Sequence, residues 1–137
     1  MELSIPAYTG HWYQIASQNA FWDKWCEYSE AWYSYDKQNN QVKVENLCFD
    51  ANHTLKSSIK GTATPTHIPT IFTLKFENGN VGQYRVLWTD YFVSFVGLPE
   101  TGYLSILCRS PQLSRQDINY LDEKARSMGF DNLNWKI

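Results

Sequence analysis

Short apolar segments, each followed by turn-forming residues, recur along most of the chain and constrain its fold more than any other feature. In residues 41–49, two valines alternate with Lys43 and Glu45, which predicts a strand with one buried face. The sequence Asn78-Gly79-Asn80 is a strong hairpin-turn signal. Eight such segments at near-regular spacing are typical of an antiparallel barrel or sandwich. The expected strands are residues 11–17, 29–35, 41–49, 55–63, 72–76, 84–88, 92–96 and 103–109.

One amphipathic helix follows the expected strands. Ser114 is a suitable N-cap, Asp117 favours the first turn, and Gly129 is a typical stop. Its apolar stripe consists of Ile118, Leu121, Ala125 and Met128. We expect this helix to pack on the outside of the closed sheet, and a short last strand, residues 134–137, to pair with the first.

The size and charge of the chain narrow the function classes. A chain of 137 residues fits a single domain, residues 1–137. The net charge is −2 and no basic run occurs, which argues against nucleic acid as a partner. Six Trp, nine Tyr and seven Phe suit either a packed core or a lined ligand cavity.

Three motifs, in order, resemble those of the lipocalins, within them the bacterial lipocalin and apolipoprotein D-like branch. Gly10-His11-Trp12 matches the Gly-x-Trp motif that opens the first strand. Thr89-Asp90-Tyr91 matches the turn between the sixth and seventh strands, and the segment 107–111 carries Arg109 at the end of the eighth. The resemblance covers nearly the whole chain.

The resemblance implies an all-β fold: an eight-stranded antiparallel up-and-down β-barrel with one C-terminal α-helix outside. It implies that Gly10, Trp12 and Arg109 close one end of the barrel, with the guanidinium over the indole. The implied function is the binding and storage or transport of a small hydrophobic ligand, of the fatty acid or lysophospholipid class. No cofactor and no metal site are expected.

Strand alternation and the resemblance together predict the barrel lining. The predicted ligand-binding residues are Ala31, Tyr33, Val44, Asn46, Ile59, Phe72, Leu74, Tyr84, Val86, Trp88, Ser105 and Leu107. Tyr33, Asn46 and Tyr84 either anchor a polar headgroup or hydrogen-bond to one another. The family branch commonly has Trp where this chain has Ser105, so the interior is either wider or filled by Trp32 or Trp88.

The first loop, residues 19–25, holds three large aromatic side chains: Phe21, Trp22 and Trp25. We expect them to guard the mouth of the barrel or to contact a membrane or a partner. A local mini-core is the alternative.

Three cysteines leave at least one thiol unpaired within the chain. Some bacterial lipocalins have Cys at positions that match Cys26 and Cys48, so the resemblance implies a candidate disulfide there, which requires an oxidising compartment. Cys108 is expected on the outward face, beneath the helix. A periplasmic or secreted location is favoured if a leader has been removed, and a cytoplasmic one otherwise.

Two other functions stay open. One is a lipid-modifying, isomerase-type enzyme on the same fold; however, the three histidines have neither metal-ligand spacing nor a paired carboxylate pattern. The other is a barrel filled by its own aromatic side chains that acts as an interaction scaffold. We expect no enzymatic activity, and a monomer or homodimer whose partner is a small hydrophobic molecule or lipid.

Overall fold

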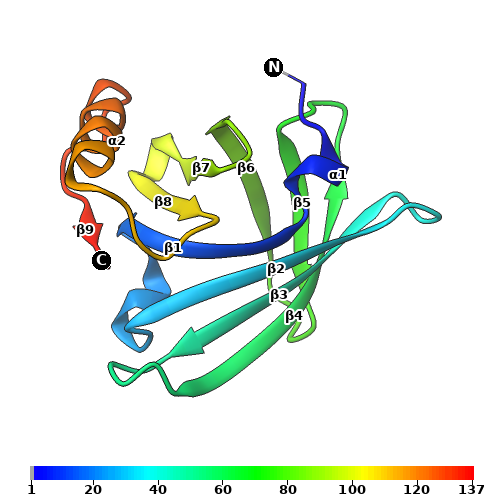
Figure 1. Ribbon diagram of the computed structural model, residues 1–137. Helices are drawn as coiled ribbons and strands as arrows, with labels where there is room; N and C mark the ends of the chain where they lie inside the picture. Colours follow the sequence, from blue (N-terminus) through cyan, green and yellow to red (C-terminus); the bar gives the residue numbers. More distant parts are fainter. Residues whose placement is uncertain (1) are drawn as a thin grey trace.

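A computed structural model describes residues 2–137, and they form a closed antiparallel β-barrel (Figure 1). The strand order is β2-β3-β4-β5-β6-β7-β8-β1-β9, and an additional β1–β2 pairing closes the barrel. The eight-stranded up-and-down barrel with one external C-terminal helix is therefore confirmed. The barrel strands are β1 (Gly10–Gln18), β2 (Tyr28–Asp36), β3 (Gln41–Phe49), β4 (Leu55–Pro65), β5 (Ile71–Phe76), β6 (Val81–Thr89), β7 (Val93–Leu98) and β8 (Tyr103–Cys108).

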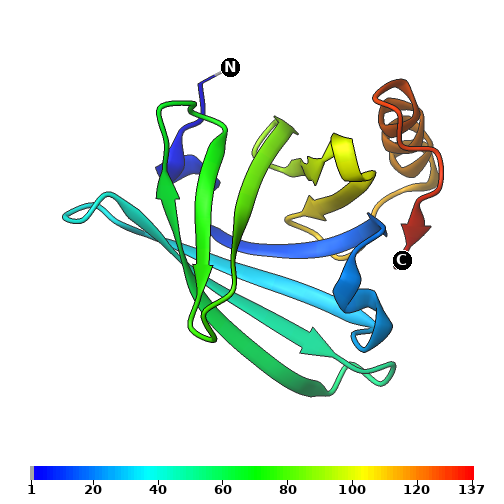
Figure 2. The same cartoon turned by 180° about the vertical axis from the view of Figure 1, so that it is seen from behind.

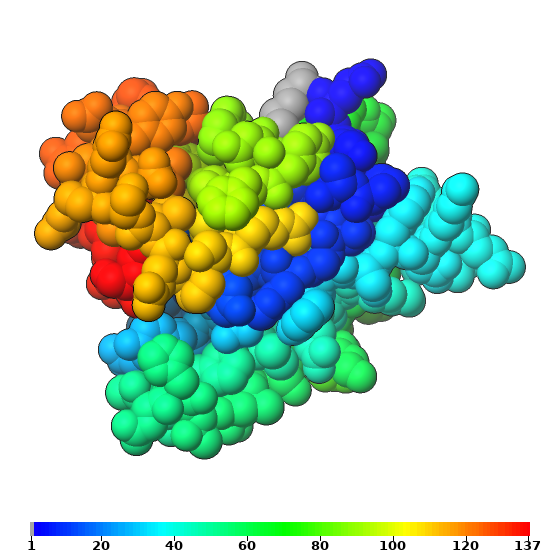
Figure 3. All heavy atoms as spheres, viewed as in Figure 1, coloured from blue at the N-terminus to red at the C-terminus, as the bar shows by residue number. Residues whose placement is uncertain are grey.

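The helix α2 (Arg115–Ser127) packs against the outside of one wall of the barrel (Figure 3). The Ser114 hydroxyl accepts a hydrogen bond from the Asp117 amide, as expected of an N-cap. Leu121 and Ala125 pack on the outward side chains of β7 and β8, and the unpaired thiol of Cys108 is buried beneath the helix. The short β9 (Asn134–Trp135) pairs with β1, as expected. No helix among residues 2–137 is long and apolar enough to cross a membrane.

A short N-terminal helix, α1 (Ile5–Tyr8), precedes the barrel and was not predicted. Its sequence signals are a Ser4 N-cap, whose hydroxyl accepts from the Ala7 amide, and a proline in the first turn. Two 3₁₀ turns, η1 (Phe21–Lys24) and η2 (Pro99–Thr101), lie in the β1–β2 and β7–β8 connections. These connections share one end of the barrel with the β3–β4 and β5–β6 turns; we call this end the mouth (Figures 1 and 2).

The inward placement of Trp88 predicted from strand alternation is wrong. The β6–β7 register shifts between Val86 and Trp88, so Val86 faces the barrel core whereas Trp88 packs in the cluster beneath α2. There its ring lies edge-on to Phe95 and under the ammonium of Lys124, 4.4 Å from the ring centroid. A β-bulge reverses the side-chain parity that follows it, and a period of two cannot anticipate this.

Candidate functional site

The closed end of the barrel is held by Arg109 and Trp12. The Arg109 guanidinium lies 3.8 Å from the Trp12 ring centroid and donates hydrogen bonds to three backbone carbonyls. Gly10 has a φ of +107°, and a Cβ there would lie 3.1 Å from Arg109 Nη1. A side chain at residue 10 is thus disfavoured both by the backbone conformation and by the guanidinium above it.

Three tyrosines cross the interior just above this closure. The Tyr8 hydroxyl, carried in by α1, lies 2.7 Å from both the Tyr84 hydroxyl and Ser94 Oγ. Tyr33 donates to the Tyr84 hydroxyl at 3.0 Å, and its ring stacks on Tyr8 with centroids 5.8 Å apart. We call Tyr8, Tyr33, Tyr84 and Ser94 the tyrosine cluster. Of the two alternatives for Tyr33 and Tyr84, the structure shows the mutual hydrogen bond.

The tyrosine cluster fills the closed half of the barrel. The space beside it is about 20 Å³, lined by Tyr8, Tyr33, Val42, Val44, Ala63, Phe72 and Tyr84. A space of that size holds about one water molecule and no ligand. Burial raises the pKa of Tyr8 to about 12 and also raises the pKa values of Tyr33 and Tyr84, so the interior disfavours a negative charge at these oxygens.

The half of the interior nearer the mouth has a different lining. Ala31, Asn46 and Ile59 are cross-strand neighbours on β2, β3 and β4, on the same face as the core residues of those strands. Asn46 and Ile59 are both partly accessible to solvent, and the Asn46 side chain hydrogen-bonds to no other described residue. We call this inner surface the mouth half.

The opposite wall of the mouth half is a small network of uncharged polar groups. Ser105 Oγ accepts from Gln14 Nε2 at 2.9 Å and from the Tyr103 hydroxyl at 3.1 Å. Trp22 closes over this wall: its Nε1 lies 3.5 Å from Gln14 Oε1, and its ring meets Tyr103 edge-on. The indole beside Ser105 is therefore Trp22. The expectation that Trp32 or Trp88 fills this space is wrong, because both lie outside the barrel.

The η1 segment that carries Trp22 is tied down at several points. Asp23 hydrogen-bonds to the Ser17 hydroxyl, and Lys136 Nζ lies 3.4 Å from the other Asp23 oxygen. A disulfide joins Cys26 to Cys48 at a Cα–Cα distance of 5.3 Å. In Figures 1 and 3 the η1 segment lies beside the β3–β4 turn at the same end of the molecule.

The predicted lining residues thus fall into two groups. Tyr33, Val44, Phe72, Leu74, Tyr84, Val86 and Leu107 lie around the closed-half core, whereas Asn46, Ile59 and Ser105 belong to the mouth half. Ala31 lies at the border between the two groups: it pairs with Asn46 on one side, and it pairs with Trp12 and packs in the closed-half core on the other. Two interior residues are absent from the predicted lining. The inward position of Gln14 follows from its alternation with Trp12, and the Ser-x-Pro signal of α1 would have placed Tyr8 next to the barrel.

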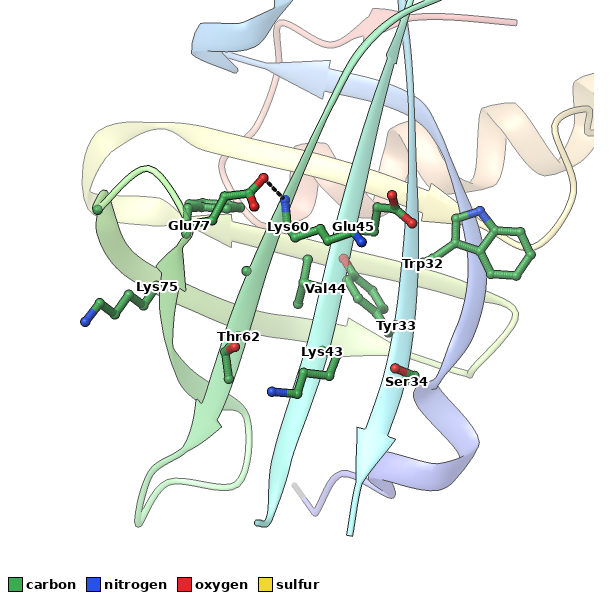
Figure 4. A pocket seen from close by; sticks show the side chains of 13 residues that line it. Trp32, Tyr33, Ser34, Lys43, Val44, Glu45, Lys60, Thr62, Lys75 and Glu77 are labelled. Carbon is green, nitrogen blue, oxygen red and sulfur yellow. Dashed lines mark hydrogen bonds between the residues drawn. The ribbon is translucent and has the colours of Figure 1, made fainter. Parts of the chain in front are cut away.

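A larger hollow, about 740 Å³, lies on the outer face of β2–β5 (Figure 4). Its rim carries Trp32, Lys43, Glu45, Lys60, Thr62, Lys75 and Glu77, which point away from the barrel. The Trp32 ring stacks on His11 with centroids 4.2 Å apart, and His11 Nε2 lies 2.6 Å from Glu30. Long charged side chains around an open hollow are typical of a solvated sheet surface.

The residues most suited to metal binding or nucleophilic chemistry, namely histidine and the unpaired cysteine, lie away from the interior. His11 and the unpaired Cys108 are on the outer faces of their strands, and His53 stacks on Tyr28 near the β3–β4 turn. Among residues 2–137, no group of three or more His, Cys, Asp or Glu side chains could hold a metal ion.

Comparison with known proteins agrees with this architecture. The family model described as a lipocalin-like domain matches residues 3–136, whereas no curated protein sequence matches significantly. Apocrustacyanin C2 is similar in structure, with a TM-score of 0.67 and 21% identity over 94% of this chain and 76% of that one. Lobster apocrustacyanin A1 has the same TM-score and identity over 95% and 77%.

The siderocalin Ex-FABP is also similar, with a TM-score of 0.64 and 16% identity over 93% of this chain and 91% of that one. Its description reports dual ligand specificities for that protein. Identities this low establish the shared fold alone. The family model spans nearly the whole chain, and the barrel, the external helix and the Arg109–Trp12 closure all agree with it. The protein therefore belongs to the lipocalin family.

Proposed function

We propose that this lipocalin binds one small hydrophobic molecule in the mouth half of its barrel and stores or transports it. The observation that carries the proposal is the character of the mouth half: Ala31 and Ile59 give it apolar walls, and the Asn46 amide is left without a partner among the described residues. Ligand sites in proteins are mostly apolar with a few placed polar groups. The wall opposite, Gln14 and Ser105, is also uncharged.

We further propose a ligand of the fatty acid or lysophospholipid class. A single acyl chain suits a narrow barrel interior, with its head group toward the mouth. The apolar side chains would contribute roughly 25 cal/mol for each Å² of chain surface removed from water. All residues proposed to line the site belong to one chain, so the site would be complete in a monomer and in each subunit of a homodimer.

The pair Ile59→Trp and Ser58→Trp tests this site. The two residues are neighbours on β4 and face opposite sides of the sheet, and Ser58 is exposed. Indole at residue 59 is expected to fill the mouth half and reduce the affinity for a fluorescent fatty acid by about tenfold or more. Ser58→Trp adds the same group outside, so its affinity should equal that of the wild type. Equal affinities of all three proteins would place the ligand elsewhere.

Binding is favoured over catalysis by the positions of the reactive side chains. The one unpaired thiol, Cys108, lies beneath α2 rather than in the barrel, and His11 stacks on the outer Trp32. One observation supports the scaffold alternative: the filled closed half leaves less interior for a ligand. A wild-type protein that binds no hydrophobic probe would favour the scaffold.

We also propose that the mouth contacts a membrane. Phe21, Trp25 and Leu55 are 65%, 50% and 53% exposed, and Lys56 Nζ donates to the Trp25 carbonyl at 2.7 Å, which brings the β3–β4 turn beside the η1 segment. Aromatic side chains beside lysine suit a membrane interface. The variant Trp25→Ser should lose cosedimentation with phosphatidylcholine vesicles, whereas Tyr120→Ser, on exposed α2, should retain it. Equal cosedimentation of both variants would contradict the contact.

A further inference from the structure

Tyr8 occupies the part of the barrel that a long hydrophobic ligand would need. The side chain enters from α1 and reaches the opposite walls: its hydroxyl contacts Ser94 on β7 and Tyr84 on β6, and its ring stacks on Tyr33 of β2. It is 7% exposed. The space left around it is about 20 Å³, too little for an acyl chain.

The backbone of α1 is fixed on both sides of the Tyr8 side chain. The Tyr8 carbonyl accepts a hydrogen bond from Trp12 Nε1 at 2.9 Å, and the Ala7 carbonyl accepts one from Arg109 Nη2 at 3.0 Å. The Ser4 amide donates to the Tyr91 hydroxyl at 2.9 Å. Displacing Tyr8 from the barrel would break these contacts as well as its own hydroxyl bonds, so the ring is a fixed floor for any ligand above it.

We infer that Tyr8 sets an upper limit on the length of the ligand, so that the barrel prefers short acyl chains to long ones. Above Val44, which lies beside the tyrosine cluster, the inward residues of β3 are Asn46 and Cys48. Four residues of strand rise roughly 13 Å, which matches a chain of about ten carbons. Longer chains would leave their additional methylenes in water at the mouth. Because Tyr8 limits a ligand only if one binds, the inference rests on the proposed function.

A series of saturated fatty acids of about 8 to 18 carbons, displacing a fluorescent hydrophobic probe, tests the limit. Each methylene that enters an apolar site raises affinity about fourfold. For the wild type, affinity should rise at this rate to about ten carbons and then stop rising. Tyr8→Ala removes on the order of 100 Å³ of side chain, room for about three methylenes. This variant should therefore bind the 14-carbon acid about tenfold or more tightly than the wild type does.

Tyr8→Phe is the matched control. It loses the same hydroxyl bonds to Tyr84 and Ser94 but keeps the ring, so its length limit should equal that of the wild type. Tyr8→Leu, which removes less volume, should shift the limit in the same direction as Tyr8→Ala and serves if Tyr8→Ala does not fold. Two results would overturn the inference and leave the proposed function standing. One is a wild-type affinity that keeps rising up to 18 carbons. The other is a length profile of folded Tyr8→Ala or Tyr8→Leu that is identical to that of Tyr8→Phe. Failure of every acid to bind any of these proteins would overturn both.

Discussion

Reducing the Cys26–Cys48 disulfide is expected to destabilise the protein by about 3 kcal/mol. The bond joins the end of the η1 segment to the mouth end of β3, across a sequence separation of 22 residues. Both cysteines are buried, at 5% and 7% exposure, and the β2–β3 hairpin between them is fully paired. The native fold therefore holds the two strand ends together without the bond, and the main effect of reduction falls on the unfolded chain.

The magnitude follows from the entropy of closing a loop in the unfolded chain. For a loop of this length the chain-entropy relation gives about 11 cal/mol/K, or about 3 kcal/mol at 25 °C. Urea unfolding followed by tryptophan fluorescence, with and without reductant, measures the difference. The m-value should be larger in the reduced protein because its unfolded chain exposes more surface.

The double variant Cys26→Ala/Cys48→Ala is the control for the remaining thiol. It should unfold at the same urea concentration with and without reductant, since Cys108 has no disulfide to lose. Oxidised and reduced wild type that agree within about 0.5 kcal/mol would refute the reasoning, because the chain-entropy term would then be absent.

Three further predictions concern the mouth, the tyrosine cluster and the closed end. Trp22→Ser should speed ligand dissociation in stopped-flow fluorescence, because the indole over the mouth half is lost, whereas Trp32→Ser on the outer face should not. Burial raises the pKa of Tyr8 to about 12, above its value in the unfolded chain, so the stability that Tyr8 contributes is fully present below pH 10 and is lost between pH 10 and 12. In urea melts over this pH range, the wild type should lose roughly 3 kcal/mol more than Tyr8→Phe, in which only the other buried tyrosines titrate. Gly10→Ala should lower the free energy of unfolding by about 2 kcal/mol or more in urea melts. The loss should exceed that of Gly79→Ala, because Gly79 has a similar φ of +93° but open space around it, and equal losses would contradict the clash at the closed end.

The architecture was predictable because it depends on repeated patterns. Alternating apolar residues specified the strands, and the N-cap Ser114 with its apolar stripe specified the external helix. The placement of Cys108 beneath that helix followed from strand parity, and the Arg109–Trp12 contact followed from the family resemblance. Each of these features is either periodic or encoded by a short motif.

The division of the interior was not predictable in the same way. Trp88 left the predicted lining because a single bulge reversed its parity, and no residue type announces that bulge. Tyr8 entered the barrel from outside the strand pattern, so alternation could not assign it to the core. Whether Tyr33 and Tyr84 bond to each other or remain free depends on that third ring, which only the folded structure brings into contact with them.

Methyl NMR during a titration with decanoic acid tests most directly whether this lipocalin holds its ligand in the mouth half. We expect saturable shifts of the Ala31 and Ile59 methyl resonances, with one acid bound per chain. The methyls of Ile106 and Ala125, which lie in the cluster beneath α2, should not move, and neither should those of Val42 at the closed half. Shifts confined to the cluster beneath α2, or no saturable shift at Ala31 and Ile59, would contradict a ligand site in the mouth half.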